Sequence, residues 1–158
     1  MVFKNEKQLK EFLMAKCKEA LIKTEEKVHS IIDKCLKQFY SEFDPEEYIR
    51  TEQLLHSLVK SDIKSVSNGY EAEVYFDTEG LDYQNGLIEL QSGRMGYANW
   101  DKDTILDVAM TGSYSGLPHG GQAKGTAIWS ESLKQLDNVY NLLVQELKAQ
   151  GIPIKKGK

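Results

Sequence analysis

The part of this sequence with the clearest chemical potential is residues 112–129, GSYSGLPHGGQAKGTAIW, which holds five of the chain's twelve glycines. Backbone N–H groups of a glycine-rich loop can cradle a phosphate, and a serine or histidine beside them can take part in nucleophilic catalysis. A nucleotide-binding P-loop needs its lysine directly after a glycine, whereas Lys124 here precedes Gly125. The dinucleotide pattern G-x-G-x-x-G is absent, and the hydrolase pattern G-x-S-x-G has Tyr114 in place of its serine. The segment therefore matches none of these three templates.

An enzyme built on this segment would need His119 to converge with Ser113, Ser115 or Lys124 in a pocket. Histidine can act as a general base because it exchanges a proton near neutral pH. The glycines at 120–121 directly follow His119 and predict a mobile side chain, which is a poor platform for catalysis. We interpret His119 as a turn or contact residue and expect no catalytic residues, with an enzyme kept as an alternative.

Residues 77–82, DTEGLD, have the composition of a calcium loop. An EF-hand needs a glutamate at its twelfth position, which Ile88 occupies here, so the segment is interpreted as an acidic turn. Glu71 and Glu73 lie two residues apart in a predicted strand and face the same side, as a solvent-exposed pair would.

The cysteines and histidines do not define a metal site. Cys17 and Cys35 fall on one predicted helix about 27 Å apart, too far for a disulfide. The chain has no C-x-x-C pair, and its three histidines are scattered along the sequence. We expect no metal and no cofactor.

Two long helices are predicted to hold the rest of the chain together. Apolar residues recur at three- and four-residue spacing from Leu9 to Tyr40 without a proline or glycine, which predicts one amphipathic helix of about 35 residues. A second apolar stripe begins after Ser130 and predicts another long helix, ended by Gly151 and Pro153.

A β-hairpin is predicted between the helices, with Asn68-Gly69 as its turn, flanked by residues 58–66 and 70–78. In the second arm, apolar residues alternate with Glu71, Glu73 and Tyr75, as in a half-buried antiparallel strand. Residues 79–100 are interpreted as loops with a short strand near 87–92, and residues 101–110 as a short helix.

These elements predict an α+β fold with long N-terminal and C-terminal helices packed on a small antiparallel β-sheet. The length of 158 residues suits a single domain over residues 1–150, followed by a flexible basic tail, residues 151–158. No signal peptide or membrane-spanning run is evident, which predicts a protein made in the cytoplasm without a membrane partner.

Charge is unevenly distributed along the chain. Residues 51–110 carry 4 basic and 11 acidic side chains, a net charge of −7, whereas residues 111–158 carry 6 basic and 3 acidic ones. An acidic middle argues against a nucleic-acid-gripping surface in that part of the chain, because phosphate contacts need a basic patch. It suits either a solvated acidic face or a surface along which DNA slides without binding.

Three pieces in order resemble a known family. They are the long N-terminal helix, the segment Tyr48-Ile-Arg-Thr51-x-x-Leu54-x-x-Ser57 leading into the hairpin, and Ile128-Trp129-x-x-Ser132-x-x-x-Leu136 opening the last helix. This order is similar to the tail-completion and head–tail joining proteins of HK97-like tailed bacteriophages, over residues 5–148. The family's middle motif often reads Thr-Gly-Arg-Leu-x-x-Ser, and here Glu52 and Gln53 stand where glycine and arginine are usual.

The resemblance implies a structural virion subunit in the phage neck or upper tail, assembled in the host cytoplasm. It implies a homo-oligomeric ring, hexameric in that family, that joins head to tail or caps the tail tube. The partners would be further copies of the chain and the neighbouring neck and tail-tube proteins, while DNA passes through the lumen without specific binding.

Ring contacts are expected from the loops at 79–100 and 112–127, which would order against neighbouring subunits, and from an edge of the hairpin. The candidate subunit-contact residues are Tyr48, Arg50, Trp100, Tyr114, His119 and Trp129. The alternative is a small bacterial binding or regulatory module, antitoxin-like or immunity-like, whose long amphipathic helix holds one protein partner.

Overall fold

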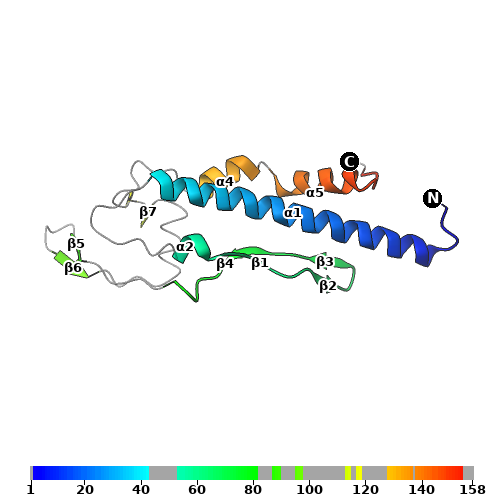
Figure 1. Cartoon of the computed structure of the whole chain (residues 1–158), viewed down its shortest axis with the longest axis horizontal. Helices are drawn as coiled ribbons and strands as arrows, with labels where there is room; N and C mark the ends of the chain where they lie inside the picture. The colour runs from blue at the N-terminus through cyan, green and yellow to red at the C-terminus, as the bar shows by residue number, and fades with distance from the viewer. Residues whose placement is uncertain are drawn as a thin grey trace. The chain divides into compact units, whose positions relative to one another are not determined.

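A computed structural model gives the arrangement of the chain's elements (Figure 1). The residues that it describes are 2–42, 53–81, 87–89, 95–97, 113–114, 117–118, 128–136 and 138–154. Helices and antiparallel strands make up this part of the chain, so the predicted α+β class is confirmed. Contacts divide the chain into two compact units. The first comprises Met1–Ile31, Val59–Tyr75 and Leu133–Lys158, and the second comprises Ile32–Leu58 and Phe76–Ser132.

The predicted N-terminal helix is present as α1, Glu6–Glu42, 37 residues long. It begins three residues before the apolar stripe because Asn5 caps it: the Asn5 side-chain oxygen accepts the N–H of Gln8 at 2.9 Å. The Gln8 side chain in turn accepts the N–H of Lys4 at 3.1 Å, which resembles the reciprocal bonds of a capping box. Both cysteines lie on this helix, and no disulfide joins them.

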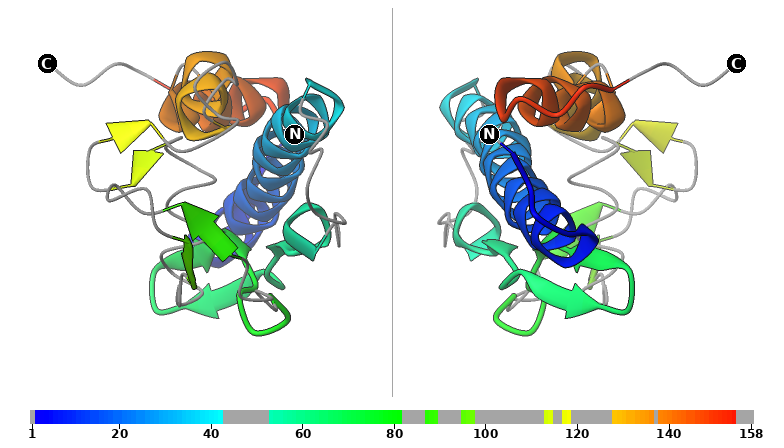
Figure 2. Two further views of the ribbon diagram at one scale, coloured as in Figure 1. Left: turned by 90° about the vertical axis from the view of Figure 1, so that its left-hand side faces the viewer. Right: turned by 90° about the vertical axis from the view of Figure 1, so that its right-hand side faces the viewer.

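In the first unit, α1 lies between the C-terminal helix α5, Val139–Ala149, and a β-ribbon (Figures 1 and 2). Towards α5, Lys16 donates to the side-chain oxygen of Gln150 at 3.2 Å, and Lys27 forms an ion pair with Glu146. Towards the ribbon, the ammonium group of Lys18 lies 5.8 Å from the ring centre of Tyr70. Helix α1 therefore has a neighbour on two sides in this unit, and packing of this kind supplies most of the stability of an amphipathic helix.

The core of the second unit collects apolar residues from widely separated parts of the chain. Its buried members are Ile32, Cys35, Leu36, Leu54, Leu58, Leu81 and Ile128. The short helix α2, Gln53–His56, contributes one of them, Leu54. Leu36 and Ile128 are essentially fully buried, so α1 and the start of the C-terminal helical region supply the most enclosed positions of this unit.

The predicted hairpin is present as an interrupted two-armed ribbon. Strand β2, Lys64–Val66, pairs with β3, Gly69–Glu71, in antiparallel register with Val66 opposite Gly69. The two-residue loop is therefore formed by residues 67–68, one residue earlier than the predicted Asn68-Gly69 turn, and Gly69 belongs to the strand. Further from the loop, β1, Leu58–Lys60, pairs with β4, Val74–Phe76. The predicted alternation of the second arm is confirmed, because residues 70, 72, 74 and 76 are half-buried and residues 71, 73 and 75 are exposed.

A one-residue irregularity separates the two halves of the ribbon. Lys64 lies opposite Glu71, whereas the N–H of Ser61 donates to the carbonyl of Glu73 at 2.8 Å. Two residues, 62 and 63, therefore face the single residue Ala72, which is the pattern of a β-bulge. The Ser61 hydroxyl accepts the N–H of Glu73 at 2.9 Å and holds the arms together beside the bulge.

The predicted small antiparallel sheet is divided: the described strands form four separate two-stranded sheets. The bulge accounts for the division of the ribbon, because it breaks the ladder between its two halves. The other two pairs lie in the second unit. Strand β5, Leu87–Glu89, pairs with β6, Met95–Tyr97, and β7, Ser113–Tyr114, pairs with β8, Leu117–Pro118. A short strand was predicted near residues 87–92, where β5 lies. Strands β7 and β8 lie inside the glycine-rich segment 112–129.

The prediction of a second long helix is wrong in one respect, because two shorter helices occupy this region. Helix α4, Ile128–Leu136, is followed by α5, which begins at Val139. Asn138 has an extended backbone, and its side-chain oxygen accepts the N–H of Tyr140 at 2.8 Å, so it is the N-cap of a new helix. The apolar stripe continues across the break in the sequence, which is why its periodicity alone predicted a single helix.

The predicted end of α5 at Gly151 is confirmed. Gly151 has a φ of 81°, its N–H donates to the carbonyl of Lys148 at 2.9 Å, and the N–H of Ile152 donates to the carbonyl of Leu147 at 3.0 Å. These two bonds form a Schellman motif, which needs a left-handed residue that glycine supplies without steric strain.

Candidate functional site

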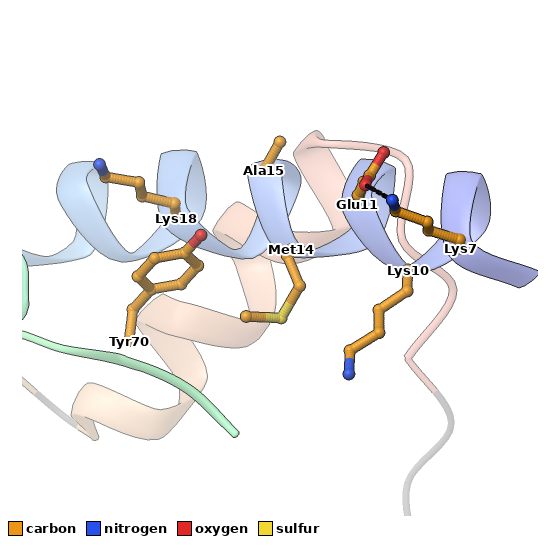
Figure 3. Close-up of a pocket in the computed structure, with 7 residues that line it drawn as sticks. All are labelled: Lys7, Lys10, Glu11, Met14, Ala15, Lys18 and Tyr70. Carbon is orange, nitrogen blue, oxygen red and sulfur yellow. Dashed lines mark ion pairs between the residues drawn. The ribbon is translucent and has the colours of Figure 1, made fainter. Parts of the chain in front are cut away.

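A groove of about 530 Å³ lies in the first unit between α1 and the tip of the ribbon (Figure 3). Six of its residues come from the first half of α1 and one from β3; they are Lys7, Lys10, Glu11, Met14, Ala15, Lys18 and Tyr70. We call it the lysine groove. Helical periodicity explains it, since residues three and four apart lie on the same face of a helix. Tyr70 reaches it because it belongs to the half-buried face of its strand.

The lysine groove has charged ends and an apolar centre. In Figure 3, Met14 extends from the helix on the same side as Tyr70 and Lys10. Lys18 lies over Tyr70 at 5.8 Å, within the range of a cation–π interaction, so this ring anchors one of the three ammonium groups. The groove thus presents cations at both ends of a patch formed by Met14, Ala15 and Tyr70.

The single carboxylate of the groove does little to neutralise it. Glu11 lies 4.0 Å from Lys7, and the two side chains are 65% and 84% exposed. An exposed pair at that distance contributes little, and the lysine-first order along the helix is the weaker of the two orientations. Three ammonium groups against one carboxylate leave a net positive groove that is chemically suited to carboxylates or phosphates.

A second hollow, of about 240 Å³, lies in the second unit and is lined by Gln53, His56, Ser57, Asp77 and Gly80. Serine, histidine and aspartate are the residue types of a hydrolase triad, but here the serine and aspartate side chains hydrogen-bond to nearby backbone groups. The Ser57 hydroxyl donates to the carbonyl of Leu54 at 2.8 Å, and the side chain of Asp77 accepts the N–H of Glu79 at 3.1 Å. A backbone hydrogen bond also joins Asp77 to Ser57, because the N–H of Asp77 donates to the carbonyl of Ser57 at 2.7 Å. These groups stabilise the end of α2 and the turn after β4.

The residues predicted from the sequence as subunit contacts fall largely outside this description. Tyr48, Arg50, Trp100 and His119 lie outside the described residues, as do Ser115 and Lys124 of the enzymatic alternative and the predicted helix at 101–110. Tyr114 belongs to strand β7 and Trp129 to helix α4. The structure therefore leaves these six contact candidates as predictions.

The lysine groove was not singled out from the sequence, although a signal for it exists. Lys7, Lys10 and Lys18 follow the same helical spacing as the apolar stripe and line a different face of α1. What sequence patterns do not give is the partner of that face, because Tyr70 is distant along the chain. The ribbon and the helix must fold together before the groove exists.

Within the part of the chain that the structure describes, no group of three histidine, cysteine, aspartate or glutamate side chains is arranged to hold a metal ion. Among the same residues, no helix combines the length and the apolar character that crossing a membrane requires.

The described elements define an α+β protein in which a long N-terminal helix and the tip of a ribbon form a net positive groove. A family model described as YomN matches residues 5–151, nearly the whole chain, so the chain belongs to the YomN family. The name is a phage-derived one and associates the chain with bacteriophages. No curated protein and no solved structure matches the chain.

Proposed function

We propose that this chain is a structural subunit of the phage neck. In this role it forms a ring at the junction of head and tail, either as a tail terminator or as a head–tail connector, through which DNA passes. It works by assembly and not by catalysis, and it is located in the virion after assembly in the host cytoplasm.

The observation that carries the proposal is the order of elements in a phage-associated chain. A 37-residue N-terminal helix, a ribbon and C-terminal helices follow one another in the same order as in the head–tail joining proteins that the sequence resembles. The family match covers residues 5–151, almost the same region as the resemblance, and independently associates that region with phages.

The surface of the chain supports an assembly role. Val2, Leu133, Val139 and Tyr140 are apolar side chains that are 47% to 94% exposed, and large exposed apolar residues suit contacts with other proteins. The acidic middle of the chain, net −7 over residues 51–110, suits a channel wall along which DNA moves without adhering.

The test is to remove the gene from the phage genome and to image the particles by electron microscopy. A neck subunit predicts heads and tails that are present but not joined, and complementation in trans should restore joined particles. Tails of uneven length would indicate a terminator, because uncapped tubes keep growing. Normal tails with heads that lose DNA would indicate a connector. Joined, infectious particles without the chain would contradict the proposal and favour the regulatory alternative.

A further inference from the structure

The lysine groove and one exposed segment of the same chain have matching patterns. From residue 71 to residue 79, every second side chain points to solvent, and no lysine or arginine is present. We call these residues the acidic segment, and its exposed members are Glu71, Glu73, Tyr75, Asp77 and Glu79. Two carboxylates therefore precede an exposed tyrosine, 49% accessible, and two more follow it. Glu73 also lies 3.7 Å from Lys64 of β2, an exposed pair that contributes little and can exchange partners.

The lysine groove has the complementary order along its length. Lys7 and Lys10 lie at one end, Met14 and Ala15 in the middle and Lys18 at the other end. The groove thus has cations, an apolar centre and a cation in that order. The acidic segment has carboxylates, an aromatic residue and carboxylates in the corresponding order. An exposed tyrosine suits an apolar patch with a polar rim, since its ring can be buried while its hydroxyl stays solvated.

The two patterns also have similar lengths. Lys7 and Lys18 are separated by about 16 Å along a helix with a rise of 1.5 Å per residue. Residues 71 and 75 are separated by about 13 Å along an extended chain with a rise of roughly 3.3 Å per residue. One extended segment can therefore place Glu71 and Glu73 at one end of the groove while Tyr75 lies near its apolar centre.

We propose that the lysine groove of one copy binds the acidic segment of a second copy, which rests on the proposed ring. Because the groove and the segment are different surfaces, the contact is heterologous, and head-to-tail repetition of such a contact closes a ring when the rotation allows it. The contact also neutralises the lysines of each subunit, which would otherwise retain DNA by its phosphates.

The test uses two full-length charge-swap variants. In the groove variant, Lys7→Glu and Lys10→Glu reverse one end of the groove; in the segment variant, Glu71→Lys and Glu73→Lys reverse the matching carboxylates. Each variant alone places like charges at every contact, so self-association measured by sedimentation equilibrium should weaken about tenfold or more, a loss near 1.4 kcal/mol. Circular dichroism and thermal unfolding verify that both variants remain folded.

Mixing the two variants gives the decisive measurement. A groove variant and a segment variant are complementary at both of their contacts, so an equimolar mixture should regain association to within about threefold of the original chain. Native mass spectrometry should then show oligomers with an even number of subunits and equal numbers of each variant. The matched control, Lys23→Glu with Lys148→Glu, makes the same charge change at exposed lysines outside the groove and should leave association unchanged.

Three results would overturn the inference. The first is an unaltered chain that stays monomeric up to its solubility limit. The second is equal weakening by the groove variant and by its control, or no recovery on mixing. The third is binding of a duplex DNA oligonucleotide that the groove variant abolishes, which would make nucleic acid the occupant. Unjoined heads and tails in the gene deletion together with any of these would retain the neck function and reject only this contact.

Discussion

Lys27 of α1 and Glu146 of α5 form an ion pair whose two sides differ in exposure. The Glu146 side chain is only 10% exposed, whereas that of Lys27 is 49% exposed. The pair connects two helices of the first unit that are far apart in the sequence. A mostly buried carboxylate needs a compensating charge much more than a half-exposed ammonium group does.

The asymmetry predicts unequal effects of removing each partner. Lys27→Met leaves the Glu146 carboxylate without its cation and should lower the free energy of unfolding by about 1–2 kcal/mol, less than for a fully buried pair because Lys27 is half-exposed. Glu146→Leu should have a smaller effect, since the ammonium group can turn to solvent and the new side chain is apolar. Urea unfolding of both variants measures the difference.

The double variant Lys27→Met/Glu146→Leu should recover most of the loss, because neither charge remains. Lys37→Met is the control: it removes an exposed lysine that pairs with Asp33 at 2.7 Å within one helix, and it should change stability by no more than about 0.5 kcal/mol. If Glu146→Leu destabilises more than Lys27→Met, the carboxylate makes another contribution and this explanation is wrong.

Gly151 predicts a purely conformational effect. It has a φ of 81°, and a Cβ built on it meets nothing within 4 Å, so an alanine there is strained by the backbone and not by a clash. Gly151→Ala should lower the free energy of unfolding by about 1–2 kcal/mol. Gly69→Ala also meets no atom, but no left-handed φ is found there, so it should be neutral within about 0.5 kcal/mol. Equal effects of the two changes on thermal unfolding would contradict this.

Asn138 predicts a capping effect at the break between α4 and α5. Asn138→Ala removes the acceptor for the N–H of Tyr140 and should destabilise by about 1 kcal/mol, whereas Asn138→Asp keeps an acceptor and should be close to neutral. Hydrogen exchange at the Tyr140 amide should accelerate in the alanine variant alone. Unchanged exchange there would mean that another group satisfies this amide.

The break at Asn138 also shows where sequence patterns stop being sufficient. The apolar positions Leu133, Leu136, Val139 and Tyr140 keep helical spacing across it, and no glycine or proline intervenes. Only the cap identifies the start of α5, and asparagine is also tolerated inside helices. By contrast, α1 and the end of α5 were predictable, because an uninterrupted stripe and a terminal glycine are strong signals.

In the ribbon, too, one feature could be predicted from the sequence and another could not. Alternation from Tyr70 to Phe76 depends on which face each side chain occupies, and it is visible in the sequence. The bulge opposite Ala72 is a question of register between two arms, and a single extra residue leaves no distinct composition. The lysine groove required that register as well, since Tyr70 meets α1 only when the ribbon folds against it.

Two leucines on helices differ strongly in burial, which predicts unequal losses of stability when each is truncated. Leu36 is fully buried and Leu133 is 49% exposed. Leu36→Ala removes apolar contacts and leaves a cavity, so it should lower the free energy of unfolding by about 2–5 kcal/mol. Leu133→Ala should change it by about 0.5 kcal/mol or less. Chemical unfolding of the two variants provides the comparison, and similar midpoints would show that the Leu36 site collapses around the missing atoms.

Two buried serines of the second unit predict changes of opposite sign. Ser132 is fully buried, and its hydroxyl makes no hydrogen bond with the residues that the structure describes, whereas the Ser57 hydroxyl donates to Leu54 at 2.8 Å. Ser132→Ala removes an unsatisfied polar group from a helix and should stabilise by about 1 kcal/mol. Ser57→Ala loses a bond and should destabilise by about the same amount. Urea unfolding decides between the signs. A loss at Ser132 as large as that at Ser57 would show that its hydroxyl bonds to a residue outside the described ranges.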